Sequence, residues 1–227
     1  MPKFLWRDCI GLTKNVERQI YSVFTSGVVS FCLTLLPKSN EMESSIVFDK
    51  NVVEFVTVSA EYCSFMEQAE QKERNEFVYV LPRLLSLLYL KALMLPETET
   101  DYSMNLEEWV TEQDYDTLRA VIAAKLGSAD DYLEVFVEEM KYSDTPVLKT
   151  ISEDLADIYQ ALKNFVHSYQ SGLNEVMAEA VAVCADGFKT YWGQTLVNTL
   201  RAVHSVNNQT DQEDDAGSSN YSEDLLW

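Results

Sequence analysis

Apolar residues recur every three to four positions along most of residues 42–206, and this period predicts amphipathic α-helices. The first helical segment begins near Asn51 and carries a regular, mostly apolar stripe: Val52, Phe55, Val56, Ser59, Cys63 and Met66. Polar residues occupy the opposite side of the same segment. Asn51 and Glu54 are spaced as in a capping box, so we expect the helix to begin at Asn51.

Residues 75–95 form the most apolar part of this region, and their leucines surround the helix axis. Arg83 and Lys91 are the only charged residues between positions 83 and 95. A helix that is apolar on every side is typical of a buried position, so we expect this segment to be the central helix. Pro82 is expected to start or kink it and Pro96 to end it. The apolar stretch is too short to cross a bilayer.

Turn residues and acidic first turns mark the next two segments. One helix is expected to begin at about Leu106 or Thr111 and to end at Leu126, with Gly127 just beyond it. Residues 128–131 resemble the start of another helix. That helix is predicted to carry a short apolar stripe: Tyr132, Val135, Phe136 and Met140.

Two further helices complete the pattern. Thr150 and Glu153 are spaced as a capping box and predict a helix that runs to about position 171. The last helix is expected over residues 173–206, where Gly187 and Gly193 interrupt it and indicate a close packing contact or a kink. No segment of the domain shows the alternation of a β-strand. We therefore predict an all-α fold, a bundle of about six helices with a central apolar helix.

Charge divides the 227 residues into three parts. The chain has 17 basic and 37 acidic residues and a formal net charge of −20. Residues 1–41 have five basic and three acidic residues, residues 42–206 have 12 and 28, and residues 207–227 have six acidic and no basic ones. We interpret 42–206 as the helical domain and 207–227 as a disordered acidic tail.

Residues 1–41 contain an apolar run, IYSVFTSGVVSFCLTLL, over positions 20–36. Serines and threonines interrupt it, and no small-residue cleavage site follows, so a signal peptide or a membrane span is a poor match. The leading interpretation is a non-native or mobile extension, with the native start at Met42. The alternatives are an extra helix or anchor and a secretory signal.

The strongly acidic composition limits the classes of partner. A net charge of −20 opposes direct binding to nucleic acid and to anionic membranes, and it favours a basic protein partner. We therefore expect no nucleic acid and, for residues 42–227, no membrane as partners. The four cysteines lack the spacing of a disulfide framework, which predicts a reducing, cytoplasmic location.

No catalytic, cofactor-binding or metal-binding motif is present, so we predict no such residues and no cofactor. His167 and His204 lack the Glu-x-x-His spacing of a di-metal site and the spacing of a zinc site. Cys63 and Cys184 lie on apolar stripes and are expected to be buried and unreactive. The acidic groups are expected in first turns or on polar helix faces: Asp114, Asp116, Asp130, Asp131, Glu134, Glu138 and Glu139.

The most unusual string, GFKTYWGQ, begins at Gly187 and is followed by further polar residues at helical spacing. We take the candidate interaction surface to be Tyr191, Trp192, Gln194, Asn198, Arg201 and Trp227. Packing of Tyr191 and Trp192 in the core is the alternative. Trp227 belongs to an apolar ending, residues 225–227, which either has no role or docks as a hook on a basic partner or on its own bundle.

Three strings also carry a resemblance: NVVEFVTVSAEYCSF from Asn51, LPRLLSLLYLKALMLP from Leu81, and YWGQ from Tyr191. Together they resemble the bacterial family designated domain of unknown function (DUF) family 5063, over about residues 42–206. None of the strings is a catalytic signature, so the resemblance implies no reaction and no functional residues. Residues 1–41 have no counterpart in the family pattern, which favours Met42 as the native start.

These observations predict a cytoplasmic helical protein that acts as a protein-binding or adaptor module without catalytic activity. The alternative is a metal-dependent or acid/base hydrolase whose carboxylates converge only in the fold. Three or four carboxylates, or a histidine, facing one deep pocket would favour the enzyme.

Overall fold

The computed structural model describes residues 44–98, 104–134 and 146–218. The chain divides into two compact units, Met1–Glu41 and Met42–Trp227, and all described residues belong to the second unit. The predictions for positions 20–36 and for Trp227 therefore lie outside the described residues. The same holds for Val135, Phe136, Met140, Glu138 and Glu139.

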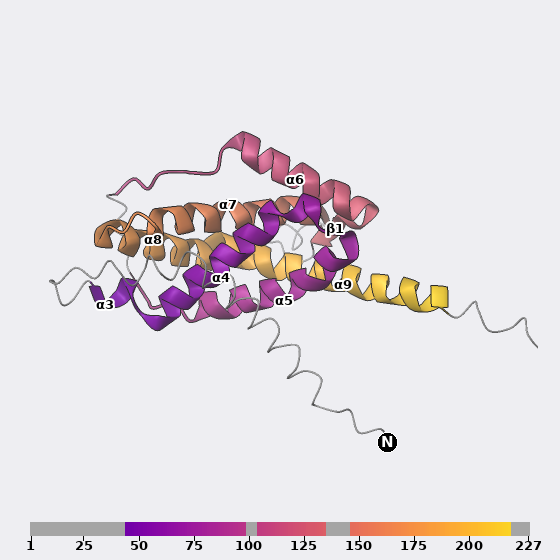
Figure 1. The fold of residues 1–227 in the computed structure, drawn as a ribbon, viewed down its shortest axis with the longest axis horizontal. Helices are drawn as coiled ribbons and strands as arrows, with labels where there is room; N and C mark the ends of the chain where they lie inside the picture. Colours follow the sequence, from indigo (N-terminus) through magenta and orange to yellow (C-terminus); the bar gives the residue numbers. More distant parts are fainter. Residues whose placement is uncertain (1–43, 99–103, 135–145, 219–227) are drawn as a thin grey trace, which may run out of the picture. The chain divides into compact units, whose positions relative to one another are not determined.

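Helices dominate the second unit (Figure 1). The α-helices are α3 (Ser44–Val47), α4 (Lys50–Glu67), α5 (Arg74–Leu93), α6 (Glu112–Leu126), α7 (Ile151–Tyr169), α8 (Asn174–Gly187) and α9 (Gly193–Ser218). Shorter elements are the 3₁₀ turns η1 (Ala69–Gln71) and η2 (Gly127–Ala129), the π-helical turn η4 (Phe188–Trp192), and strands β1 (Asp131–Glu134) and β2 (Val147–Thr150). The predicted all-α class is confirmed, because the two short strands are the only departure within the described residues.

The central helix of the bundle is α7, not the predicted segment 75–95. Helix α7 packs against α4, α6, α8 and α9, and more than half of its residues are buried. Helix α5 packs on α4 and α9 and leaves Leu87, Leu90 and Leu93 exposed. A segment that is apolar on all sides is not necessarily packed on all sides. The number of helices that surround it is determined by the fold.

Local capping signals explain several helix boundaries. The side chain of Thr111 accepts from the backbone N–H of Asp114, whose carboxylate accepts in return from Thr111, so this end of α6 is a capping box. Thr150 is the N-cap of α7, as predicted, and its side chain accepts from the N–H of Glu153. The predicted start of α4 at Asn51 is wrong, because Asp49 is the N-cap and its carboxylate accepts from the Asn51 N–H at 2.8 Å.

A β-hairpin replaces the helix predicted after residue 128. Strands β1 and β2 are antiparallel, with Asp131 opposite Thr150 and Glu134 opposite Val147. The residues that resemble a helix start instead support α7: the Asp130 carboxylate accepts from both the N–H and the hydroxyl of Ser152, at 2.8 and 2.6 Å. A capping carboxylate can serve a helix that begins 21 residues later, as Asp130 does for α7, and the sequence pattern does not distinguish the two cases.

The last predicted helix is broken by a π-helical turn and continues further than expected. The N–H of Gly193 donates to the carbonyl of Phe188, five residues earlier, as in a π-helix. This turn lies between Gly187 and Gly193, the two glycines expected to mark a kink or a close contact. Helix α9 then extends to Ser218, past the predicted boundary at Val206. Once a helix is nucleated, each further residue costs little, so polar residues can prolong it.

The core is built from the inner faces of α4, α5, α7, α8 and α9. Phe55, Phe165 and Trp192 form an aromatic group at its centre, with ring centroids 5.2 and 6.3 Å from Phe55. The hydroxyl of Tyr62 donates to the carbonyl of Leu155 at 2.9 Å, which joins α4 to α7. Among the described helices, none combines the length and apolar character that a bilayer crossing requires.

Candidate functional site

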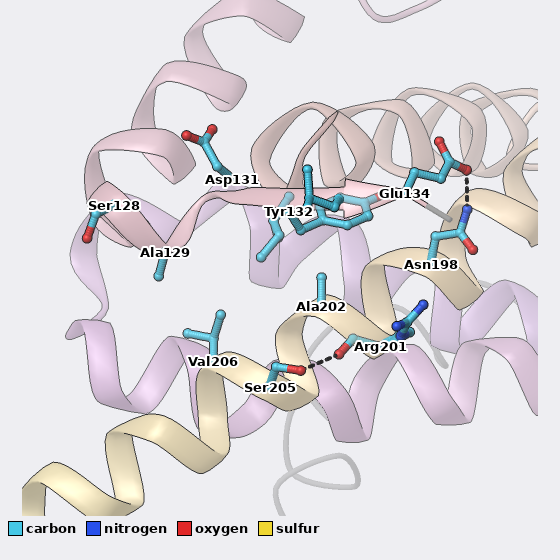
Figure 2. Close-up of a pocket in the computed structure, with 12 residues that line it drawn as sticks. Ser128, Ala129, Asp131, Tyr132, Glu134, Asn198, Arg201, Ala202, Ser205 and Val206 are labelled. Carbon is cyan, nitrogen blue, oxygen red and sulfur yellow. Dashed lines mark hydrogen bonds between the residues drawn. The ribbon is translucent and has the colours of Figure 1, made fainter. Parts of the chain in front are cut away.

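A pocket of about 280 Å³ lies between strand β1 and the middle of helix α9, and we call it the α9–hairpin pocket. Its lining residues are Ser128, Ala129, Asp131, Tyr132, Leu133, Glu134, Ile151, Asn198, Arg201, Ala202, Ser205 and Val206. Figure 2 shows Ala202 and Val206 of α9 directed toward the hairpin side of the pocket. The lining combines apolar side chains with groups that donate and accept hydrogen bonds, as binding pockets do.

Strand β1 presents an edge without a neighbouring strand in the described part of the chain. The N–H of Ile151 donates to the carbonyl of Asp130 at 2.8 Å. Because hydrogen-bonded pairs alternate along an antiparallel ladder, this bond and the register direct the N–H and C=O of Asp131 and Leu133 away from β2. The pocket is lined by all four residues of β1 and by none of β2, so Asp131 and Leu133, whose backbone groups point away from β2, are both lining residues.

The predicted polar stripe of α9 lies beside the pocket. The amide of Gln194 donates to Asn198 at 2.9 Å, and the amide of Asn198 donates to Glu134 at 2.5 Å. Figure 2 shows this second bond linking α9 to the end of β1. Arg201 is exposed and also lines the pocket. Two of the candidate residues, Asn198 and Arg201, therefore line the pocket, and Gln194 is bonded to one of them.

The two aromatic candidates occupy different environments. Trp192 is only 1% exposed, and its indole N–H donates to the carbonyl of Cys184 at 3.1 Å, so it belongs to the core and not to a surface. Tyr191 is 54% exposed, and its hydroxyl donates to Asp157 on α7. Both residues belong to the π-helical turn, where the Tyr191 side chain is exposed and the next, Trp192, is buried.

A buried polar network lies behind the hairpin and centres on Asp154 of α7, which is 1% exposed. Its carboxylate accepts from the hydroxyls of Tyr132 and Thr199 and lies 3.7 Å from the ammonium of Lys149. Burial raises the pKa of Asp154, although these partners oppose the shift. Lys149 also lies 3.5 Å from Glu134, whose side chain is 8% exposed.

Burial by itself would lower the pKa of the Lys149 ammonium. The charges of Asp154 and Glu134 outweigh this effect, and the net pKa shift is upward. Lys149 is therefore held as a cation between two carboxylates, and it joins the hairpin to α7. The positive charge of Lys149 offsets the negative charges of Asp154 and Glu134, which allows both carboxylates to be buried.

Asp157, one turn after Asp154, joins three elements. It accepts from Tyr115 of α6 at 2.7 Å and from Tyr191 of the π-helical turn. Partial burial, together with the neighbouring carboxylate, raises the pKa of both phenols. Sequence reasoning missed Asp154 and Asp157. Their spacing of three residues on α7 was a detectable signal, because it places two acids on one face of a mostly apolar helix.

Comparison with known proteins identifies the family. The family model described as "Domain of unknown function (DUF5063)" matches residues 46–209. The chain belongs to the DUF5063 family. The crystal structure of protein BF1032 from Bacteroides fragilis is 43% identical to it, covers 80% of this chain and 99% of its own, and has a TM-score of 0.63. A search of curated proteins finds no match.

The match confirms the resemblance inferred from the three sequence strings. The residues that the DUF5063 model covers include both walls of the α9–hairpin pocket and the network behind it. The pocket is therefore part of the family domain and does not lie in an added segment. The family description names no reaction or ligand, so the function must be argued from the site.

The remaining groups that could carry chemistry in this DUF5063 chain are two cysteines and two histidines. Cys63 and Cys184 are free and buried; burial raises the pKa of the Cys63 thiol to about 12 and that of Cys184 further. His167 stacks on Trp109 with ring centroids 3.8 Å apart, and His204 is exposed on α9. In the described ranges, no three His, Cys, Asp or Glu side chains are grouped to hold a metal ion.

Proposed function

We propose that this protein is a protein-binding or adaptor module without catalytic activity of its own. In this proposal an extended segment of a basic partner protein binds in the α9–hairpin pocket and adds a strand to the edge of β1. The proposal is supported by two observations: Asp131 and Leu133 line the pocket, and their backbone groups have no partner strand within the described residues. Backbone hydrogen bonds supply affinity in such complexes, and side-chain pockets supply specificity.

The surroundings of the edge suit an extended peptide. Leu133 and Leu148 are opposite each other in the hairpin register and are 55% and 64% exposed. On the other side of the pocket, Ala202 and Val206 provide an apolar floor, with Asn198 and Arg201 at its end. Alternate side chains of an added strand would contact these two sides. The net charge of −20 would accelerate the approach of a basic partner.

The arrangement of the carboxylates supports binding over acid/base hydrolysis. Asp154, Glu134 and Asp157 converge in the fold, as the hydrolase alternative requires, but each already accepts hydrogen bonds from side chains of the same chain. Only Glu134 of these three lines the pocket. The groups hold the hairpin on α7 and α9, and they form a support for the strand edge.

A cytoplasmic location is part of the proposal. Cys63 and Cys184 are free thiols buried in the hydrophobic core. Free buried cysteines are typical of proteins that fold in a reducing compartment. Location is tested by fractionating cells that express the full chain and by locating it in the soluble or membrane fraction.

The test begins with a peptide-display selection on the full chain, followed by calorimetric titration of the enriched peptides. Two substitutions at one position separate a backbone interaction from a side-chain interaction. Leu133→Pro deletes an N–H that points away from β2, so the hairpin is retained while the donor to an added strand is lost. Leu133→Ala keeps this N–H. We expect Leu133→Pro to weaken binding at least tenfold and Leu133→Ala to weaken it much less.

A second pair of variants tests the pocket itself. Ser205→Tyr fills the pocket from an exposed position of α9, and His204→Tyr places the same side chain on the neighbouring exposed position outside the lining. Loss of binding in Ser205→Tyr with retention in His204→Tyr supports the proposal. Enriched peptides that bind all four variants equally would refute a site at this edge.

A further inference from the structure

Helix α5 carries a stripe of exposed apolar side chains, which we call the α5 stripe. It comprises Leu87, Leu90, Leu93 and Met94, which are 36%, 53%, 58% and 42% exposed. Their spacing of three to four residues places them along one side of the helix. The other side of α5 is fully used, because Leu81, Leu85 and Leu88 are 0% exposed in the core.

The stripe is more than scattered surface hydrophobicity. Single exposed leucines are ordinary, but several in a row on one helix form a continuous apolar surface of the kind that marks an interaction site. In the described residues, α5 contacts α4 and α9 on its inner side, and nothing described covers the stripe. The stripe is separate from the α9–hairpin pocket, because none of its residues lines that pocket.

The charges at the ends of the stripe identify its partner. Arg83 is exposed one turn before Leu87, and Glu97 is exposed shortly after Met94. The stripe is therefore basic at one end, apolar in the middle and acidic at the other end. Such a surface is complementary to a second copy of itself when the two copies run in opposite directions.

The local charge of α5 also allows a second copy of the acidic chain to bind at this face. Helix α5 contains Arg74, Arg83 and Lys91 but only one acidic residue, Glu76. Lys91 forms an ion pair with Glu54 of α4 at 2.6 Å, so these two charges offset each other beside the stripe. Elsewhere two copies with a net charge of −20 each would repel one another, and α5 is a face where they can meet.

We propose that two copies of this chain form an antiparallel homodimer through the α5 stripe. With Leu87 of one copy beside Leu90 of the other, Arg83 lies close to the end of the partner helix and to Glu97 beyond it. A positive charge at a helix C-terminus is favourable, and the twofold axis makes each such contact twice. A parallel arrangement would instead bring Arg83 against Arg83 and Glu97 against Glu97. This inference does not depend on the proposed peptide-binding function.

The first test is analytical ultracentrifugation of the full chain over a range of concentrations up to about 1 mM. We expect a species with twice the 25.9 kDa mass of the chain. Leu90→Lys is expected to weaken the dimer at least about 100-fold, because each dimer contains the substitution twice. Leu133→Lys is the matched control, since Leu133 is equally exposed but lies on the hairpin. It should leave the dimer intact.

The second test addresses the antiparallel register. Arg83→Glu and Glu97→Arg should each weaken the dimer, and the double exchange should restore most of the lost affinity because the two charges swap places. Circular dichroism of every variant confirms that the fold is retained. A mass of 25.9 kDa at all concentrations would overturn the proposal. Insensitivity of the dimer to Leu90→Lys, or failure of the double exchange to restore it, would overturn it as well.

Discussion

In the π-helical turn between α8 and α9, replacing Gly193 by alanine is expected to destabilise the protein, whereas the same substitution in an ordinary α-helix is stabilising. A Cβ atom at Gly193 would lie 2.2 Å from the carbonyl oxygen of Phe188 and 2.8 and 2.9 Å from two carbons of its ring. The ring can rotate away, but the oxygen belongs to the backbone and accepts the π-helical hydrogen bond from Gly193 itself. Relief would therefore require the turn to change its geometry.

The magnitude follows from two opposing effects. Replacing a glycine by alanine in an α-helix stabilises it by about 1 kcal/mol. Crowding in a packed interior costs about 1–3 kcal/mol and more where the neighbour cannot move. Removing the extra residue of the π turn would rotate α9 by about 100° and displace Asn198 and Thr199 from their partners. We therefore expect Gly193→Ala to lower the free energy of unfolding by about 2 kcal/mol or more.

Urea denaturation followed by circular dichroism measures this change, and Gly187→Ala is the matched control. A Cβ at Gly187 would lie 3.3 Å from the ring of Trp192, a tight contact with a side chain and not with the backbone. Helix propensity offsets this cost, so the control should change stability by less than about 1 kcal/mol. If Gly193→Ala instead stabilises the protein by about 1 kcal/mol, the segment is an ordinary α-helix and the reasoning is refuted.

Three further predictions concern the core, the buried network and the thiols. Leu88→Ala should lower the free energy of unfolding by about 2–5 kcal/mol, because Leu88 is 0% exposed, whereas exposed Leu148→Ala should change it by less than about 0.5 kcal/mol; equal effects would contradict the assigned burial. Since burial raises the pKa of Asp154 above 3.8, its contribution to stability is largest below that pH and falls as pH rises through the shifted pKa. The stability difference between wild type and Asp154→Asn should thus shrink with rising pH in urea titrations, and a widening difference would refute the sign. Cys63, with a pKa raised to about 12, should react with an alkylating reagent at pH 7 only after unfolding, and equal native and denatured rates by mass spectrometry would contradict this.

The sequence predicts the helices well where local signals determine them. The capping residues Thr111 and Thr150 and the glycine after α6 mark boundaries through backbone groups close in sequence. The sequence does not predict which helix is central, because that depends on how many other helices pack around α5 and α7. The hairpin is also missed, since β1 is only four residues long and its pairing with β2 joins segments distant in sequence.

The candidate site shows the same division. Gln194, Asn198 and Arg201 could be predicted as one polar stripe because they share a helix face. The partner of Asn198 is Glu134, 64 residues away, and no pattern in the sequence connects them. The spacing of Asp154 and Asp157 on α7 was detectable, but the partners of Asp154 were not, since Tyr132 and Thr199 come from a strand and from another helix. Networks of this kind arise from tertiary packing and are not encoded in local periodicity.

The central claim is that a partner segment adds a strand to the edge of β1, and amide hydrogen exchange measured by NMR tests it most directly. In the free protein, the N–H groups of Asp131 and Leu133 should exchange quickly, because both point away from β2. In complex with a display-selected peptide, these two amides should become protected, while the exchange of Tyr132, already paired within the hairpin, should change little. Binding of the peptide with no added protection at Asp131 and Leu133 would contradict the account.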